Sequence, residues 1–144
     1  MAVRLAPVQR HRIRFDPNLP YYGWLEDVDF SRRAAVHGRC VRAAALRGVH
    51  LGVKGGRTAG ENFGYSQIAN PIYLMKRSTM QPGHALTMIS RNMAANIARS
   101  LRPEPWVDRR GRLKGNIMAL FDLLMGRLHP QRISSLEPDS NAQS

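Results

Sequence analysis

The stretch WLEDVDFSRRAAVHG, residues 24–38, carries the clearest signals of local structure in this chain. Three carboxylates (Glu26, Asp27 and Asp29) stand near its beginning, basic residues follow them, and a glycine closes it. Negative charge at the start of a helix and positive charge towards its end are both favourable to the helix dipole. Glycine is a common stop signal. The stretch therefore predicts a helix with its carboxylates in the first turn.

The segments on either side of this helix are predicted to be extended. In residues 1–20 apolar side chains alternate with arginines, and the segment closes on the turn-forming residues DPNLP. Residues 39–46 have the pattern of a strand. Because an isolated pair of strands is not stable by itself, this part of the chain requires a sheet that the remaining residues supply poorly.

The second half of the chain is predicted to be helical. It follows a long loop at residues 48–64, which hold six of the twelve glycines. Apolar residues then recur at helical spacing, and prolines interrupt them. We predict a helix past Gly64 that is interrupted or begun at Pro71, amphipathic helices over about 83–101 and about 112–128, a break at 102–106, and a disordered tail from Ser134.

Charge and composition narrow the class of protein. The chain has 144 residues with 22 basic and 10 acidic side chains, a net charge of +12, and each half contributes +6. This even spread excludes a basic tail on a neutral body and suggests an anionic partner such as a nucleotide, nucleic acid or lipid headgroup. A single cysteine, Cys40, excludes an intramolecular disulfide framework and any multi-cysteine metal site.

The sequence also bears on location. It has no run near the ~18 apolar residues that a membrane-spanning helix requires. The arginine-rich start lacks the apolar core of a secretory signal. We therefore expect a cytoplasmic protein, with peripheral contact at the inner face of the cell membrane left open.

The cluster EDVD at residues 26–29 has two interpretations. Carboxylates this close repel one another unless a cation, a hydrogen-bond donor or a helix N-terminus stabilises them. The simpler interpretation is a charged first helical turn. The functional interpretation is a general base that protrudes into a cleft and takes a proton from a hydroxyl group.

The wider context of this cluster resembles the second half of a family 2 glycosyltransferase. The resemblance rests on an ordered series: Phe15-Asp16, then YGWLEDVDF at 22–30 followed by Arg33 and Gly38, then Gly48-Val49-His50, and YSQIANPIYL at 65–74. It covers roughly residues 12 to 80, and its Glu-Asp-x-Asp start is moderately specific.

The resemblance implies a fold and a reaction. The fold would be α/β: a partial GT-A-like nucleotide-sugar transferase domain with short strands, followed by amphipathic helices. Residues 1–64 would form the acceptor side of the catalytic domain, 65–133 a helical extension and 134–144 a disordered tail. Asp27 would be the general base of an inverting sugar transfer, with Glu26 beside it and Trp24 and Asp29 in contact with the acceptor, a saccharide or a lipid-linked saccharide.

The resemblance also implies parts that this sequence lacks. In the family, the donor pocket and the Asp-x-Asp that binds a divalent metal, Mg or Mn, precede Phe15. We therefore expect either a C-terminal fragment or a gene called from an internal methionine, and in both cases a chain that is inactive by itself. Lys54 and Arg57 in the glycine-rich loop are candidates for binding the donor diphosphate, although the loop lacks the ending of a Walker site. His50 is a candidate metal ligand, but one imidazole does not make a metal site.

Two non-catalytic hypotheses stand beside this one. Arginines between residues 32 and 47 could line a nucleic-acid surface, but no stacking aromatics or known binding motif accompany them, and solvated surface is the simpler interpretation. The C-terminal helices place Arg91, Arg99, Lys114 and Arg127 beside apolar stripes. Such helices either pack on other protein elements or lie in the interface of an anionic membrane.

Overall fold

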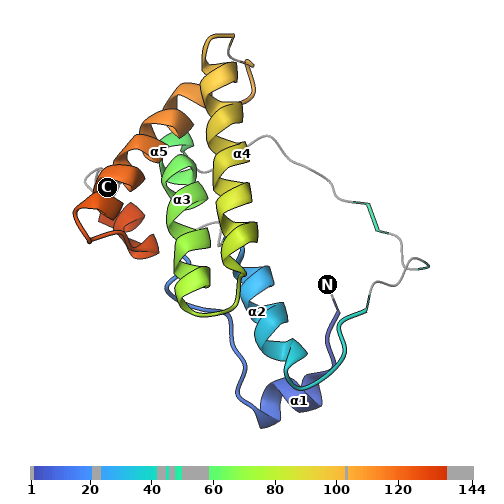
Figure 1. Ribbon diagram of the computed structural model, residues 1–144. Coiled ribbons are helices and arrows are strands. Elements are labelled where there is room, and N and C mark those ends of the chain that lie inside the picture. Colours follow the sequence, from blue (N-terminus) through green and yellow to red (C-terminus); the bar gives the residue numbers. More distant parts are fainter. Residues whose placement is uncertain are drawn as a thin grey trace, which may run out of the picture.

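The computed structural model describes residues 2–20, 24–41, 45, 48–49, 59–102 and 104–135, and these residues form helices and connecting turns (Figure 1). The predicted α/β class is wrong for this part of the chain, because none of its residues forms a strand. The helical elements in chain order are α1 (Leu5–Arg10), α2 (Glu26–Ala35), α3 (Gly60–Lys76), α4 (Pro82–Ser100), α5 (Arg109–Leu124) and the 3-10 helix η1 (Pro130–Ser135).

The error in the predicted fold class lies in the segments near the N-terminus that were expected to be extended. Residues Leu5–Arg10 are helical, and Pro7 is tolerated there because an N–H in the first helical turn has no partner within the helix. Residues 39–41, 45 and 48–49 belong to no strand, and the others up to residue 58 lie outside the described residues. A strand needs a neighbour to satisfy its backbone N–H and C=O groups, and the described part of the chain offers none.

The helices predicted from capping and periodicity are confirmed, with small shifts of their ends. The helix expected over 24–38 is α2, and the two expected over about 83–101 and 112–128 are α4 and α5. Helix α3 departs from the prediction, because it begins inside the predicted loop and continues through Pro71 without a break. Pro71 is buried, as are Ala69 and Asn70 before it and Leu74 after it. This burial stabilises the helix although the proline removes one backbone hydrogen bond.

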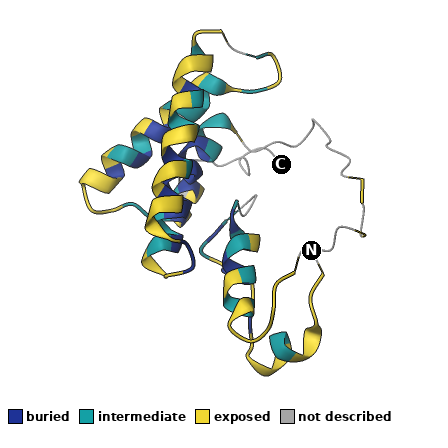
Figure 2. Ribbon diagram, turned by 45° about the vertical axis from the view of Figure 1, so that its right-hand side comes forward, coloured by how far each residue is buried: buried dark blue, intermediate teal, exposed yellow. Residues whose placement is uncertain are grey.

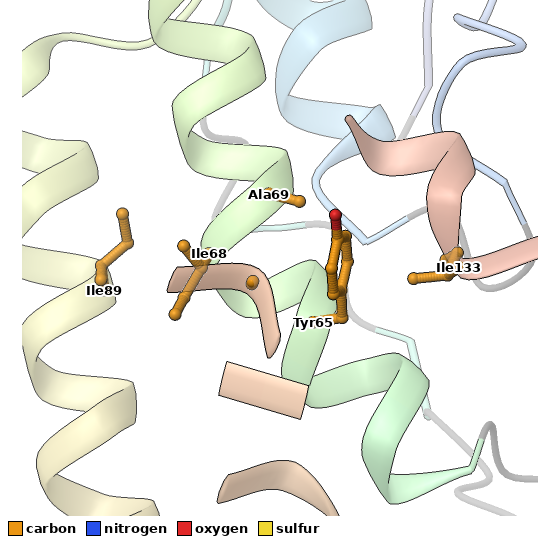
Figure 3. Close-up of a cluster of buried hydrophobic side chains, with 6 residues drawn as sticks. Tyr65, Ile68, Ala69, Ile89 and Ile133 are labelled. Carbon is orange, nitrogen blue, oxygen red and sulfur yellow. The ribbon is translucent and has the colours of Figure 1, made fainter. Parts of the chain in front are cut away.

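Helix α3 is the centre of the molecule and packs on α4, α5 and η1 (Figure 1). Figure 2 shows that the buried residues concentrate on α3 and on the sides of the other helices that face it. One buried cluster joins these elements, and in Figure 3 Tyr65 stands between Ile68 and Ile133. A second cluster packs Leu19 and Leu25 from the N-terminal segment against Leu74, Met80 and Ala85.

The contact between α3 and α5 is unusually close. A methyl group added at Gly64 would lie 2.6 Å from the Cα of Arg112, and one added at Gly115 would lie 2.6 Å from the backbone nitrogen of Tyr65. The amide of Asn116 donates to the carbonyl oxygen of Gly64 at 2.7 Å. Small residues therefore let the two backbones approach until a side-chain amide can bridge them.

Candidate functional site

Helix α2 begins at Glu26, directly after a residue with a left-handed backbone, and its first turn carries the predicted general base. The residue before it, Leu25, adopts a left-handed conformation with φ 74° and is buried in the second core cluster. The next residue, Glu26, is half-buried, whereas Asp27 is exposed. The Oδ1 atom of Asp27 accepts a hydrogen bond from the backbone N–H of Val28 at 2.9 Å. The exposed carboxylate of Asp27 thus lies at the positive end of the helix dipole.

Asp29 occupies the opposite environment. Its side chain is completely buried and forms an ion pair with Arg33, one turn later, at 2.7 Å. The Nε atom of Arg77, which caps the end of α3, lies 3.9 Å from Asp29 Oδ1. That oxygen has no hydrogen-bond partner among the described residues. Asp29 therefore fastens α2 to the end of α3, and its predicted contact with an acceptor would need this pairing to open.

Asp16 completes the network around Arg77. Its carboxylate accepts hydrogen bonds from the backbone N–H of Asn18 and the hydroxyl of Tyr73, both at 2.9 Å. It also lies 3.4 Å from Arg77 Nε. Burial would raise the pKa of Asp16, but these hydrogen bonds and the charge of Arg77 outweigh it and hold the pKa below its ordinary value. Two buried carboxylates, Asp16 and Asp29, thus flank one arginine.

Trp24 connects the start of α2 to α3. Its carbonyl oxygen accepts a hydrogen bond from the side-chain amide of Asn70 at 2.8 Å. Its ring lies 5.8 Å from the ring of Phe63, centre to centre. The side chain is half-buried. Trp24, Glu26 and Asp27 therefore form one anchored turn with the carboxylate of Asp27 on its outer side.

The other predicted site residues are not part of this turn. His50, Lys54 and Arg57 lie outside the described residues. Within the described ranges, no three His, Cys, Asp or Glu side chains come together in a way that could hold a metal ion. Asp27 and Asp29 have the spacing of an Asp-x-Asp pair, but one is exposed and the other buried, so their carboxylates do not converge.

Sequence reasoning missed the residues that hold the turn in place. Asp16 and Tyr73 both lie in the quoted motif segments, but neither was assigned a role, and nothing in the sequence around Arg77 marks it as their partner. The hydroxyl of Tyr73 and the carboxylate of Asp16 come from residues 57 positions apart. A residue-by-residue pattern does not reveal a contact at that separation.

Comparison with known proteins leaves the family open. No family model, curated protein or solved structure matches this chain. In the described residues, no helix is both long enough and apolar enough to cross a membrane.

Proposed function

We propose that this chain supplies the acceptor side of a glycosyltransferase, with Asp27 as the general base. The observation that carries the proposal is the contrast between two carboxylates on one helical turn. Asp27 is exposed at the helix N-terminus, whereas Asp29 is buried and ion-paired. A general base must come within hydrogen-bond reach of the proton it removes. Asp27 is the accessible one of these two residues.

The surroundings of Asp27 support this role because they keep the turn rigid. Catalytic groups act best when their positions are set before the substrate binds. The ion pair between Asp29 and Arg33 anchors the first turn of α2 from inside. The hydrogen bond from Asn70 anchors the preceding residue, Trp24. The half-buried ring of Trp24 offers an apolar surface with a polar N–H, suited to an amphipathic acceptor such as a sugar.

In the proposed reaction an acceptor hydroxyl gives its proton to the carboxylate of Asp27. The hydroxyl oxygen forms a bond to the anomeric carbon of a nucleotide-sugar donor. The bond from that carbon to the diphosphate breaks, and its electron pair leaves with the nucleoside diphosphate. Attack opposite to the leaving group inverts the anomeric centre.

The donor is proposed to be held largely by a separate donor-binding half, which the test below supplies. Lys54 and Arg57 remain candidates for contact with the diphosphate. A divalent cation would neutralise the diphosphate when bound, but the described residues do not provide a group to hold it.

The test joins this chain, fused or in trans, to the donor-binding half of a family 2 glycosyltransferase. Transfer of labelled sugar to saccharide and lipid-linked acceptors is then measured. We expect Asp27→Asn to lower kcat by about 10²- to 10⁴-fold, the usual contribution of a positioned base. The matched control is Asp108→Asn, also at an exposed helix start, where asparagine caps as well as aspartate.

The outcomes separate the assignment of the base from the proposed activity. Normal transfer by a folded Asp27→Asn protein would show that another group is the base. Absence of transfer by the unmodified chain with every donor-binding half would contradict the proposed function. Asp29→Asn is expected to reduce transfer through loss of folded protein, which circular dichroism detects.

A further inference from the structure

Helix α5 buries its small and polar side and exposes its large apolar side, which is the reverse of an ordinary surface helix. The face it buries against α3 is small and polar: Gly115, Asn116, Ala119 and Asp122. The face it exposes carries large apolar side chains: Ile117 is 60%, Phe121 50% and Leu124 82% exposed. A helix of a water-soluble protein normally buries its large apolar residues and exposes its polar ones. The outer face of α5 therefore lacks its apolar partner in this structure.

Helix α4 extends this exposed apolar surface. Leu86, Ile97 and Leu101 are 59%, 51% and 81% exposed. Their spacing places them on one side of the helix at 3.6 residues per turn. An open hollow joins the end of α4 to the first half of α5, with Leu101, Leu113 and Ile117 in its lining. We use the term α4–α5 apolar face for the exposed side chains of Leu86, Ile97, Leu101, Ile117, Phe121 and Leu124.

The interior behind this face resembles the contacts of helices in lipid. There, small residues bring the backbones close and side-chain amides hydrogen-bond between helices, while large apolar residues point outwards. In this chain Gly64 and Gly115 make the close approach. The buried amide of Asn96 donates to Asn116 at 2.8 Å and to Gln67 at 2.7 Å. The described helices are too short or too polar to cross a bilayer, so the matching arrangement is one that lies on its surface.

The charges around the α4–α5 apolar face indicate which kind of lipid surface it would bind. Residues 82–128 contain eight arginines and lysines against three acidic residues, a net charge of +5. The hollow has Arg110 and Lys114 in its lining beside the apolar side chains, and Lys114 also pairs with Glu61 at 2.8 Å. The guanidinium of Arg127 lies 5.5 Å from the centre of the Phe121 ring. Long basic side chains beside apolar ones extend towards headgroups while the apolar groups insert.

The net charge of +5 already includes the three acidic residues of this region. Asp122 is buried and pairs with Arg127 at 3.0 Å, and Asp108 caps the start of α5. Glu104 is engaged by Arg99 at 3.1 Å and by Arg109 at 2.9 Å. A second copy of the chain would bring two positively charged faces together, which is unfavourable. Nucleic acid would leave the apolar side chains in water.

We propose that the α4–α5 apolar face docks on a lipid surface that contains anionic headgroups. The apolar side chains enter the boundary between headgroups and acyl chains, and the surrounding arginines and lysines contact the headgroup phosphates. This inference does not depend on the proposed transferase activity, because none of its residues belongs to the turn around Asp27.

The test is co-sedimentation of the full chain with phosphatidylcholine vesicles, with and without phosphatidylglycerol. We expect binding only to the anionic vesicles and weaker binding at high salt. Phe121→Ser combined with Leu124→Ser should weaken binding by about tenfold or more, the loss expected when buried apolar side chains are removed. Arg110→Gln should weaken it by about fivefold, the worth of one basic residue at an anionic surface.

Matched controls lie outside the face. Val36→Ser removes an apolar side chain that is 80% exposed at the end of α2. Arg4→Gln removes an exposed charge near α1. Both should bind vesicles as the unmodified chain does. Circular dichroism checks that each variant is folded, and Leu124→Ser alone replaces the double variant if that one loses helicity.

Three results would overturn the proposal. The first is no binding to anionic vesicles. The second is binding that is unchanged by the Phe121 and Leu124 substitutions, which would reveal simple adsorption of a basic protein. The third is self-association in sedimentation equilibrium that the same substitutions abolish, without vesicle binding. Asp27→Asn should leave vesicle binding unchanged, so failure of the transferase assay and failure of this one are distinguishable.

Discussion

Replacement of Gly115 by alanine tests the close packing of α3 on α5. The new Cβ would stand 2.6 Å from the backbone nitrogen of Tyr65 and closer still to the carbonyl oxygen of Glu61, whereas ordinary contacts of such an atom are 3.4–4 Å. Because both neighbours are backbone atoms, no side chain can rotate away. The two helices must therefore separate by about 1 Å or more in an interior that is packed like a crystal.

The magnitude follows from three effects. Overpacking costs about 1–3 kcal/mol, and the upper end applies where backbone must move. Separation also weakens the hydrogen bond from Asn116 to Gly64, which contributes about 1 kcal/mol. Alanine gains about 1 kcal/mol over glycine in helix propensity. We expect the free energy of unfolding to fall by about 3 kcal/mol, because the steric cost exceeds the gain in propensity.

Urea denaturation followed by circular dichroism measures this change. The control is Gly83→Ala in the first turn of α4, where nothing lies within 4 Å of the added atom. The control should leave stability unchanged or raise it by up to about 1 kcal/mol. If Gly115→Ala were as stable as the unmodified chain, the close helix contact would not exist in solution and the reasoning would be refuted.

Three further predictions concern buried polar groups. Asp29→Asn should lower the free energy of unfolding by about 2–3 kcal/mol, which is less than the loss of a wholly buried ion pair would cost because Arg33 reaches solvent. Asp27→Asn should change it by less than about 0.5 kcal/mol. Equal effects of the two substitutions in urea denaturation would contradict the contrast between the two carboxylates. Burial would raise the pKa of Asp122, but hydrogen bonds from Tyr65 and nearby arginines hold it below its ordinary value. The stability this carboxylate contributes is therefore complete above the unfolded pKa of about 3.9 and is lost as pH falls through the folded value. The melting temperature should therefore fall as the pH is lowered from about 4 to about 2, and an equal fall in Asp122→Asn would argue against this cause. Asn116→Ala should cost about 2–3 kcal/mol in urea denaturation, because it leaves the Gly64 carbonyl without its side-chain donor; a neutral effect would mean that water replaces the amide.

The helices could be predicted where their signals are local. The carboxylates of α2 and the apolar spacing of α4 and α5 all act within a few residues of the positions they determine. The N-terminal strands could not be predicted correctly from local alternation. Alternation indicates a strand only if a neighbouring strand exists to satisfy its backbone, and no local pattern shows whether one does.

The sequence does not show which side of each helix is buried. The apolar spacing of α4 predicts one stripe of five residues: Leu86, Ile89, Met93, Ile97 and Leu101. Ile89 of this stripe is buried and Met93 half-buried, but Leu86, Ile97 and Leu101 are exposed, and the helix buries Ala85 and Asn96 in their place. Periodicity shows that a helix has an apolar side, but the close approach of α3 and α5 determines which side is covered. Long apolar side chains do not fit where glycines let two backbones meet.

The candidate site shows the same division. The sequence by itself determined that three carboxylates share the first turn of one helix, because their spacing and the helix dipole are properties of a few adjacent residues. Only the tertiary structure decided that Asp29 is buried and that Asp27 faces solvent. That choice depends on Arg77, 48 positions further along the chain than Asp29. Its charge reaches Asp29 only after α3 has packed against the N-terminal segment.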